Sequence, residues 1–244
     1  MARHRAVRQK LGVRAGYTRA KAGDPGALPT TARESSVWNA FRNGVWTPPE
    51  AAGLYPGSQF PSDPDSIEQF FRQQTPDTGE EPMTPEHRRF LGSSMAELLK
   101  LTGPAVLVTH PNSGQYGWYA AMAARPGEVK AIVAYEPGAF TFPQGERPAN
   151  IPARAELVDL VMEPRMVPQE DFRKLTAMPI IVIYGDNIAK EPSEVFNVDV
   201  WRVASTRAKQ FVDAVNRHGG DAQLVFLPDI GLAGNTHAPF ADLN

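Results

Sequence analysis

A hydroxyl, two carboxylates and an imidazole each follow a short apolar run of the sequence. In chain order these residues are Ser113, Glu136, Asp186 and His237. A hydroxyl that attacks, a histidine that accepts its proton and an acid that orients the histidine together carry out covalent acyl transfer. The residue types and their order therefore indicate nucleophilic catalysis, provided that the fold brings these side chains together.

Four apolar runs predict the strands that must position these residues. They read AVLVT, KAIVAY, PIIVIY and QLVFL, at 105–109, 130–135, 179–184 and 223–227. The runs lack alternation of apolar and polar residues, which is typical of strands buried on both faces. Helical patterns separate them, so the sequence predicts an α/β fold with a mostly parallel sheet flanked by helices. Because sites in such sheets form beyond the carboxyl ends of the strands, the candidate side chains should meet at one edge.

The segment THPNSG, residues 109–114, has the spacing of a tight strand-to-helix turn that presents a nucleophile. Such a turn needs small residues two positions before and two positions after the nucleophile. Thr109 and Ser113 satisfy this rule around Pro111, whereas Pro111 and Gln115 do not satisfy it around Ser113. The spacing therefore places Pro111 at the nucleophile position, where its ring offers no attacking group. Because proline fixes φ at about −65°, we expect this turn to relax and not to hold a strained backbone.

The combined motifs resemble those of the α/β-hydrolase superfamily, in particular those of bacterial esterases whose triad follows the order Ser, Glu, His. In that group the turn reads T-H-S-x-S/G-G, the acid lies in AIV-x-x-EPG, and the histidine follows GN. The matching segments here are THPNSG at 109–114, AIVAYEPG at 131–138 and GNTH at 234–237. The resemblance implies carboxylic-ester hydrolysis in which a serine attacks, His237 relays the proton and Glu136 orients the histidine. It implies no cofactor and no metal.

Four residues near the expected site have further interpretations. Ser113 is either a displaced nucleophile or a hydroxyl that caps the helix after the turn. Asp186 is the reserve acid because it follows the next strand, and otherwise it caps its own loop. His110 is expected to pack under the turn. The Asn112 amide is the expected oxyanion donor, and the sequence offers no evident loop for a second donor.

The chain divides into an irregular, Pro/Gly-rich N-terminal region, residues 1–83, and an α/β-hydrolase-like region, residues 84–244. In the first region only SIEQFFRQQ, residues 66–74, has a helical pattern. We therefore expect residues 1–80 to pack poorly and to contribute no more than a marginal strand. By comparison with the family, the N-terminal strands of the sheet and the closing C-terminal helix are expected to be lacking.

The composition of the 244 residues excludes several kinds of chemistry and partner. A net charge of −2 gives no electrostatic signature of nucleic-acid binding, and the absence of cysteine excludes disulfides and thiolate catalysis. No apolar run approaches the roughly 20 residues that cross a bilayer. The expected partner is a small ester-like substrate or ligand, without nucleic acid or membrane, and the expected location is the cytoplasm. The basic segment 1–21 is a targeting segment, a basic tail or the remnant of a longer chain.

Two functions of other classes stay open beside ester hydrolysis. A hydrolase-fold protein without a nucleophile can act as a non-catalytic binding protein, which needs the pocket but not the chemistry of the turn. The same fold can support a lyase or isomerase in which His237 acts as a general base without a covalent intermediate. Such an activity would depend on His237 and would be indifferent to Ser113.

Overall fold

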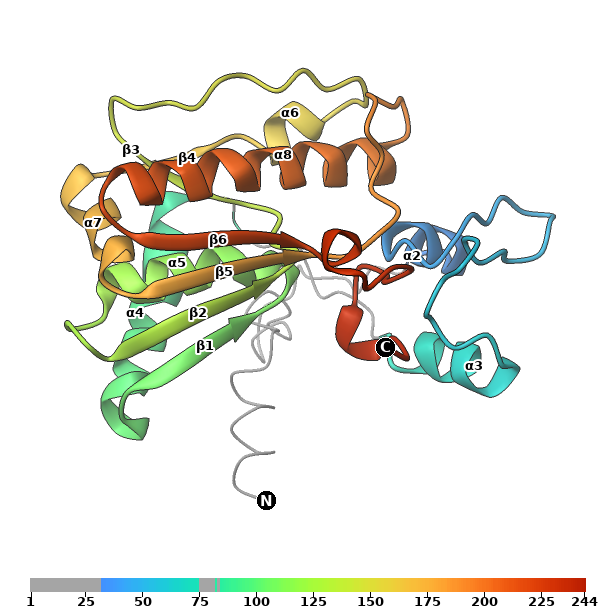
Figure 1. Ribbon diagram of the computed structural model, residues 1–244, viewed down its shortest axis with the longest axis horizontal. Coiled ribbons are helices and arrows are strands. Elements are labelled where there is room, and N and C mark those ends of the chain that lie inside the picture. Colours follow the sequence, from blue (N-terminus) through green and yellow to red (C-terminus); the bar gives the residue numbers. More distant parts are fainter. Residues whose placement is uncertain (1–31, 75–81, 83) are drawn as a thin grey trace, which may run out of the picture.

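A computed structural model describes residues 32–74, 82 and 84–244, and a parallel sheet lies at its centre (Figure 1). The strand order is β1-β2-β5-β6. The strands are β1 (Ala105–Thr109), β2 (Val129–Tyr135), β5 (Pro179–Tyr184) and β6 (Asp221–Phe226). Every neighbouring pair in this sheet is parallel. The four predicted apolar runs therefore form one sheet, with β1 at one edge and β6 at the other.

Helices precede, connect and flank the strands. The α-helices are α2 (Glu34–Ala40), α3 (Pro64–Arg72), α4 (Pro85–Thr102), α5 (Gly114–Ala123), α6 (Val158–Val161), α7 (Gln169–Lys174) and α8 (Phe196–Arg217). The 3-10 helices are η1 (Pro111–Ser113), η2 (Leu175–Ala177), η3 (Leu227–Ile230) and η4 (Pro239–Ala241). The predicted α/β class, a mostly parallel sheet flanked by helices, is confirmed. In the described part of the chain, no strand precedes β1, no α-helix follows β6, and no helix is long and apolar enough to cross a membrane.

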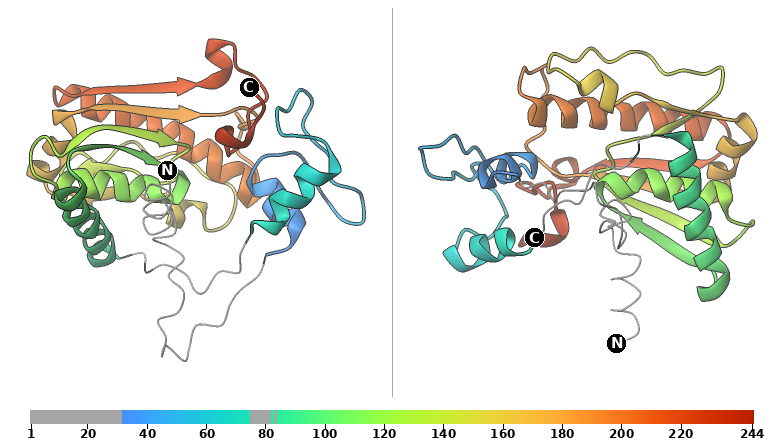
Figure 2. Two further views of the ribbon diagram at one scale, coloured as in Figure 1. Left: turned by 90° about the horizontal axis from the view of Figure 1, so that it is seen from below. Right: turned by 180° about the vertical axis from the view of Figure 1, so that it is seen from behind.

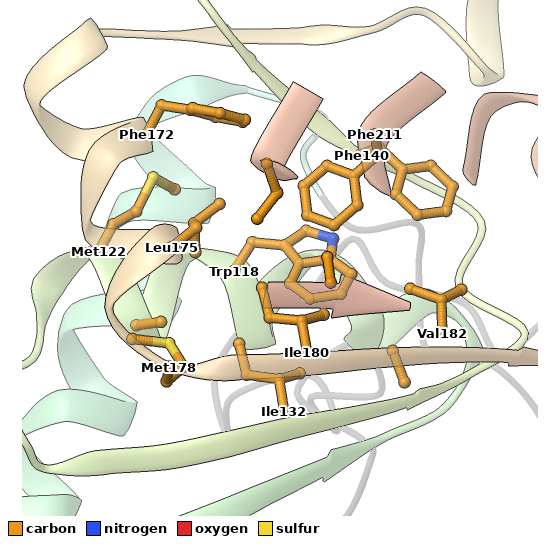
Figure 3. Packing of buried hydrophobic residues seen from close by; sticks show 14 of the residues in the cluster. Trp118, Met122, Ile132, Phe140, Phe172, Leu175, Met178, Ile180, Val182 and Phe211 are labelled. Carbon is orange, nitrogen blue, oxygen red and sulfur yellow. The ribbon is translucent and has the colours of Figure 1, made fainter. Parts of the chain in front are cut away.

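The main core lies between one face of the sheet and the helices α4, α5, α7 and α8. Ile132 and Ile180 point from β2 and β5 into this core, where they meet Trp118 of α5 and Phe211 of α8 (Figure 3). Trp118, Ile132 and Phe211 have no exposed surface. Removing such large apolar side chains from water contributes about 25 cal/mol per Å² of buried area, so this layer holds the sheet and its helices together.

The opposite face of the sheet differs from the expectation for a sheet buried on both faces. Val106 and Val108 of β1 are 51 % and 65 % exposed. Side chains alternate between the two faces of a strand, so these valines lie opposite to Leu107, which belongs to the main core. The expectation of burial on both faces is therefore wrong for β1. The helices that contribute to the core gather on the face that Leu107 shares.

A second, two-stranded sheet was not predicted. It consists of β3 (Thr141–Pro143) and β4 (Arg165–Val167), which pair in parallel. Each strand has only three residues, which is too short for a hydrophobic period to stand out from the surrounding sequence. This small sheet lies near α7 at one end of the molecule (Figure 1).

The expectation that residues 1–80 pack poorly is wrong for residues 32–74, and residues 1–31 and 75–80 lie outside the described part. Trp38, Phe60 and Phe70 form a separate buried aromatic cluster, with Trp38 fully enclosed. These aromatic residues are spread without regular spacing among loops and short helices, which explains why their pattern predicted no core. Figure 2 shows α2 and α3 beside the loops at one end of the sheet, and Trp201 Nε1 of α8 donates to the Ala40 carbonyl over 3.0 Å. The division of the chain at residue 83 stays a prediction.

Candidate active site

Glu136 and His237 meet at the carboxyl edge of the sheet. Glu136 follows β2 directly, and His237 lies in the loop between η3 and η4, beyond β6. His237 Nδ1 donates to Glu136 Oε2 over 2.7 Å, and both side chains are almost completely buried. The contact that the sequence analysis predicted between these two residues is present.

Aromatic rings enclose the imidazole of His237. Its centroid lies 4.0 Å from that of Trp201, 4.6 Å from that of His110 and 5.4 Å from that of Phe41. Because Nδ1 donates to a carboxylate, the neutral ring carries its free lone pair on Nε2. The arrangement therefore presents Nε2 as the atom able to accept a proton.

Arg42 is a further member of this cluster that the sequence analysis missed. Its Nη1 and Nη2 donate to Glu136 Oε2 and Oε1 over 2.6 and 2.5 Å, and its Nε donates to the Asp186 carbonyl over 3.0 Å. The guanidinium also lies 5.7 Å from the ring centroid of Trp201. Glu136 and Asp186 are 94 and 144 residues further along the chain, so no local pattern could mark this arginine. The many aromatic residues around Arg42 are the one sequence signal that could have indicated a packed segment there.

The backbone around the carboxylate is held in an uncommon conformation. Glu136 and Arg42 have φ values of 46° and 52°, in the left-handed region that favours glycine. Such conformations cost about 1–3 kcal/mol each and persist where the surrounding contacts fix them. Here the Gly185 amide donates to Glu136 Oε1 over 2.6 Å. A Cβ on Gly185 would lie 2.6 Å from the Thr236 carbonyl oxygen, so this close approach requires glycine.

The charges around Glu136 set the protonation states of the cluster. Burial alone would raise the pKa of Glu136, but Arg42 and the hydrogen bond from His237 outweigh it and hold that pKa at about 2. Burial lowers the pKa of His237 below its usual value, and Arg42 adds to this shift while Glu136 opposes it. At neutral pH the carboxylate is therefore ionised and the imidazole is neutral. These are the states that a general base and its orienting acid require.

Asp186, the reserve acid, makes no hydrogen bond to His237 in the described part of the chain. Its Oδ2 accepts from the Gly234 amide over 2.8 Å, and its Oδ1 accepts from the Asn187 amide over 2.6 Å. The Asp186 amide in turn donates to the Asn235 carbonyl over 2.9 Å. Asp186 thus fastens the end of β5 to the loop that carries His237, which corresponds to its loop-capping interpretation.

The segment after β1 forms the 3-10 turn η1 with Pro111 at its first position. The described non-glycine residues with positive φ are Arg42, Glu136, Leu157 and Asn187, and none of them lies in the segment 109–114. The turn is therefore free of the left-handed strain of a nucleophile turn, as we expected from the proline at this position.

The hydroxyl of Ser113 is occupied by the backbone of His110. Ser113 Oγ donates to the His110 carbonyl over 2.6 Å and accepts from the His110 amide over 2.9 Å. The hydroxyl therefore closes the turn that precedes it, and it makes no capping bond to α5, the helix that follows. The expectation that Ser113 caps the following helix is wrong in this respect, because the 3-10 turn places the hydroxyl over His110.

Asn112 lies in the middle of η1, where its Oδ1 accepts from Gln115 Nε2 over 2.8 Å. The role of its amide as an oxyanion donor stays a prediction. Two cavities formed by described residues lie elsewhere, and neither is lined by Pro111, Glu136 or His237. In residues 32–74, 82 and 84–244, no group of three or more His, Asp and Glu side chains could hold a metal ion.

His110 links the turn to the histidine loop, and both of its ring nitrogens are used. Nε2 donates to the His237 carbonyl over 2.7 Å, and the side chain accepts from the Ser113 amide. Burial and the neighbouring His237 lower the pKa of His110 to about 4. Protonation would remove the acceptor for the Ser113 amide, so the folded state holds this ring neutral.

We expect the free energy of unfolding to fall on acidification from about pH 6.5 to pH 4, in part because of His110. In this range the unfolded chain binds a proton at residue 110 and the folded chain does not, so each pH unit costs up to about 1.4 kcal/mol. The substitution His110→Asn keeps an acceptor for the Ser113 amide and should reduce this slope by about 1 kcal/mol per pH unit. Urea titrations at several pH values measure the slope of the unfolding free energy against pH in both proteins. The contributions of the other histidines are the same in both and cancel. Equal slopes would contradict a neutral, buried His110.

Comparison with known proteins points to lipases and esterases. No family model matches this chain. The chain is 24 % identical over 238 residues to the probable secreted lipase phiG of a fungal species (strain ATCC 74256), an alignment that covers 86 % of this chain and 60 % of the lipase. It also resembles the solved structure of a novel bacterial esterase, with a TM-score of 0.60 and 27 % identity over 91 % of this chain and 57 % of that chain. The fold is α/β-hydrolase-like, and the chain spans less than two thirds of each relative.

Proposed function

We propose that this chain is an ester-hydrolase scaffold with an intact acid–histidine pair and an impaired nucleophile position. The contact between Glu136 and His237, reinforced by the bidentate bond from Arg42, carries the proposal. The two residues lie where the strand-end rule puts an orienting acid and a base. The names of both relatives, a lipase and an esterase, support carboxylic esters as the substrate class.

The chemistry of the pair follows from its protonation states. In acyl transfer, a hydroxyl attacks the ester carbonyl while His237 Nε2 takes the hydroxyl proton, and the imidazolium later gives this proton to the leaving alcohol. The Glu136 carboxylate orients the ring through Nδ1 and stabilises its positive charge. Pro111 has no hydroxyl at the position that the turn would present, and the Ser113 hydroxyl donates to the His110 carbonyl. Neither Pro111 nor Ser113 therefore offers His237 an attacking hydroxyl, and low or absent ester turnover follows from the proposal.

A non-catalytic binding protein is the second candidate, and Pro111 is the observation that favours it. A binding protein needs no attacking group, and the near-complete burial of His237, which is 2 % exposed, fits a structural role for its imidazole. The buried cluster of Arg42, Glu136 and His237 would then contribute to the stability of the fold. A lyase or isomerase with His237 as base is the third possibility.

We expect the unmodified chain to hydrolyse p-nitrophenyl acetate no faster than buffer does, and Ser113→Ala to leave this result unchanged. The reason is that neither Pro111 nor Ser113 offers a hydroxyl to His237. The measurement is the initial rate of p-nitrophenol release at equal concentrations of the folded proteins. Turnover in the unmodified chain that disappears in Ser113→Ala would make Ser113 the nucleophile and overturn this part of the proposal.

The partner and location of the chain are proposals of the same kind. We infer a small ester-like molecule as the substrate or ligand, and neither nucleic acid nor a membrane as a partner. The cytoplasmic location expected from the sequence stays a prediction, because the fungal relative is named as a secreted lipase.

A further inference from the structure

A cleft lies between α4, α5 and the small sheet of β3 and β4, away from His237. The described residues leave a volume of about 900 Å³ there. Its charged lining residues are Glu86, Arg88, Arg89, Arg147, Glu163, Arg165, Asp171 and Lys174. Positive charges outnumber negative charges in this set. The cleft shares no residue with the candidate active site.

Every acid that lines this cleft is already paired with a base. The ion pairs are Glu86 with Arg89 at 3.0 Å, Glu163 with Arg147 at 3.1 Å, and Asp171 with Lys174 at 2.9 Å. Two bases remain without a carboxylate partner in the described part of the chain, namely Arg88 and Arg165. Among the described residues, the cleft therefore carries two positive charges that no carboxylate compensates.

Arg88 is almost completely buried and Arg165 is half-buried. Arg88 is 6 % exposed, and its Nε is buried without a hydrogen-bond partner. The Nε of Arg165 is buried without a partner as well, while its Nη2 donates to the Val161 carbonyl over 3.0 Å. A buried charge without a partner is costly, and two such charges of the same sign also repel each other. An anion bound at the two guanidinium groups would offset their charge and weaken their mutual repulsion.

Close packing of α4 on α5 brings a third donor to the same cleft. Gly92 follows Arg88 by one turn of α4, and a Cβ on Gly92 would lie 2.6 Å from the backbone of Tyr119. Tyr119 also lines the cleft and is 7 % exposed. Burial lowers the pKa of Arg165, Arg88 lowers it further and Tyr119 opposes this shift, so the three groups lie within electrostatic range of one another.

We propose that this cleft binds a phosphate group through Arg88 and Arg165, with the Tyr119 hydroxyl as an additional donor. A guanidinium offers parallel N–H donors that match the oxygen spacing of phosphate, and two guanidinium groups neutralise its two negative charges. A volume of about 900 Å³ exceeds the needs of inorganic phosphate. The natural ligand is therefore a small soluble phosphomonoester that places its phosphate at the arginines.

Calorimetric titration of the full chain with inorganic phosphate and with glycerol 3-phosphate tests this proposal, with chloride at equal ionic strength as the reference. We expect saturable binding of both phosphates and a loss of affinity of about tenfold or more in Arg88→Met and in Arg165→Met. Arg72→Met is the control, because Arg72 is an exposed arginine that pairs with Glu68 in α3 and does not line the cleft, and it should change the affinity less than twofold. If Arg88→Met does not fold, Arg165→Met and Arg88→Lys carry the same comparison.

Three outcomes would contradict the proposal. The first is the absence of phosphate binding by the unmodified chain at millimolar concentration. The second is unchanged affinity in both arginine variants, or binding only to vesicles that contain phosphatidic acid. The third is phosphate binding that appears only after Glu80→Gln and Glu81→Gln are combined, because carboxylates of this chain would then be the partners of the two arginines. Equal binding with and without these two acids supports a site for an external phosphate.

Discussion

Replacement of Pro111 by serine is expected to raise the rate of p-nitrophenyl acetate hydrolysis by about 10³-fold over the unmodified chain. Loss of the serine from an intact triad costs about 2 × 10⁶ in rate. One missing oxyanion donor costs about 10²–10³. The ratio of these two factors predicts a rate increase of about 10³–10⁴. It applies when a hydroxyl is restored at the position that the spacing of 109–114 assigns to the nucleophile.

Pro111→Ala is the matched control for this gain. It removes the same constraint on φ but adds no hydroxyl, so we expect no increase in rate. The double variant Pro111→Ser with His237→Asn should lose the gain, because no base then accepts the hydroxyl proton. Circular dichroism spectra establish that each variant is folded. Equal gains in Pro111→Ser and Pro111→Ala, or no gain in folded Pro111→Ser, would refute the assignment of Pro111 to the nucleophile position.

Substitution of Arg42 by methionine should lower the free energy of unfolding by about 3–5 kcal/mol. The change keeps much of the side-chain volume but leaves the fully buried Glu136 carboxylate without its bidentate partner. Removing one member of a buried ion pair is strongly destabilising because the remaining charge stays desolvated. Urea denaturation followed by tryptophan fluorescence measures the effect.

Two further variants separate loss of the ion pair from loss of packing. Arg72→Met breaks an exposed pair with Glu68 in α3, whose side chains are 65 % and 59 % exposed, and should cost less than about 1 kcal/mol. Arg42→Met combined with Glu136→Gln removes both charges and should be more stable than the sum of the single effects by about 2 kcal/mol. Strict additivity of the two substitutions would show that Arg42 does not act through the charge of Glu136.

Much of the fold could be predicted from local sequence patterns. Apolar runs of five or six residues marked β1, β2, β5 and β6 to within two residues, because a buried parallel strand needs a continuous apolar segment. Glu136 and His237 each follow a predicted strand, so the sequence predicted that they meet at one edge of the sheet, where the carboxyl ends of parallel strands lie together. The same spacing assigned Pro111 to the turn after β1.

Tertiary structure decided the contacts between segments that lie far apart in the chain, which local sequence patterns do not contain. Arg42 reaches Glu136 across 94 residues, from a segment with no regular period, so only the folded chain could make the pairing visible. The Ser113 hydroxyl turned back to His110 because the 3-10 turn fixed its direction, and residue spacing does not determine this direction. The sequence by itself determined which residues end each strand of the sheet. The folded chain determined which of them are in contact and which charges are left without partners, because both depend on distances between segments far apart in the chain.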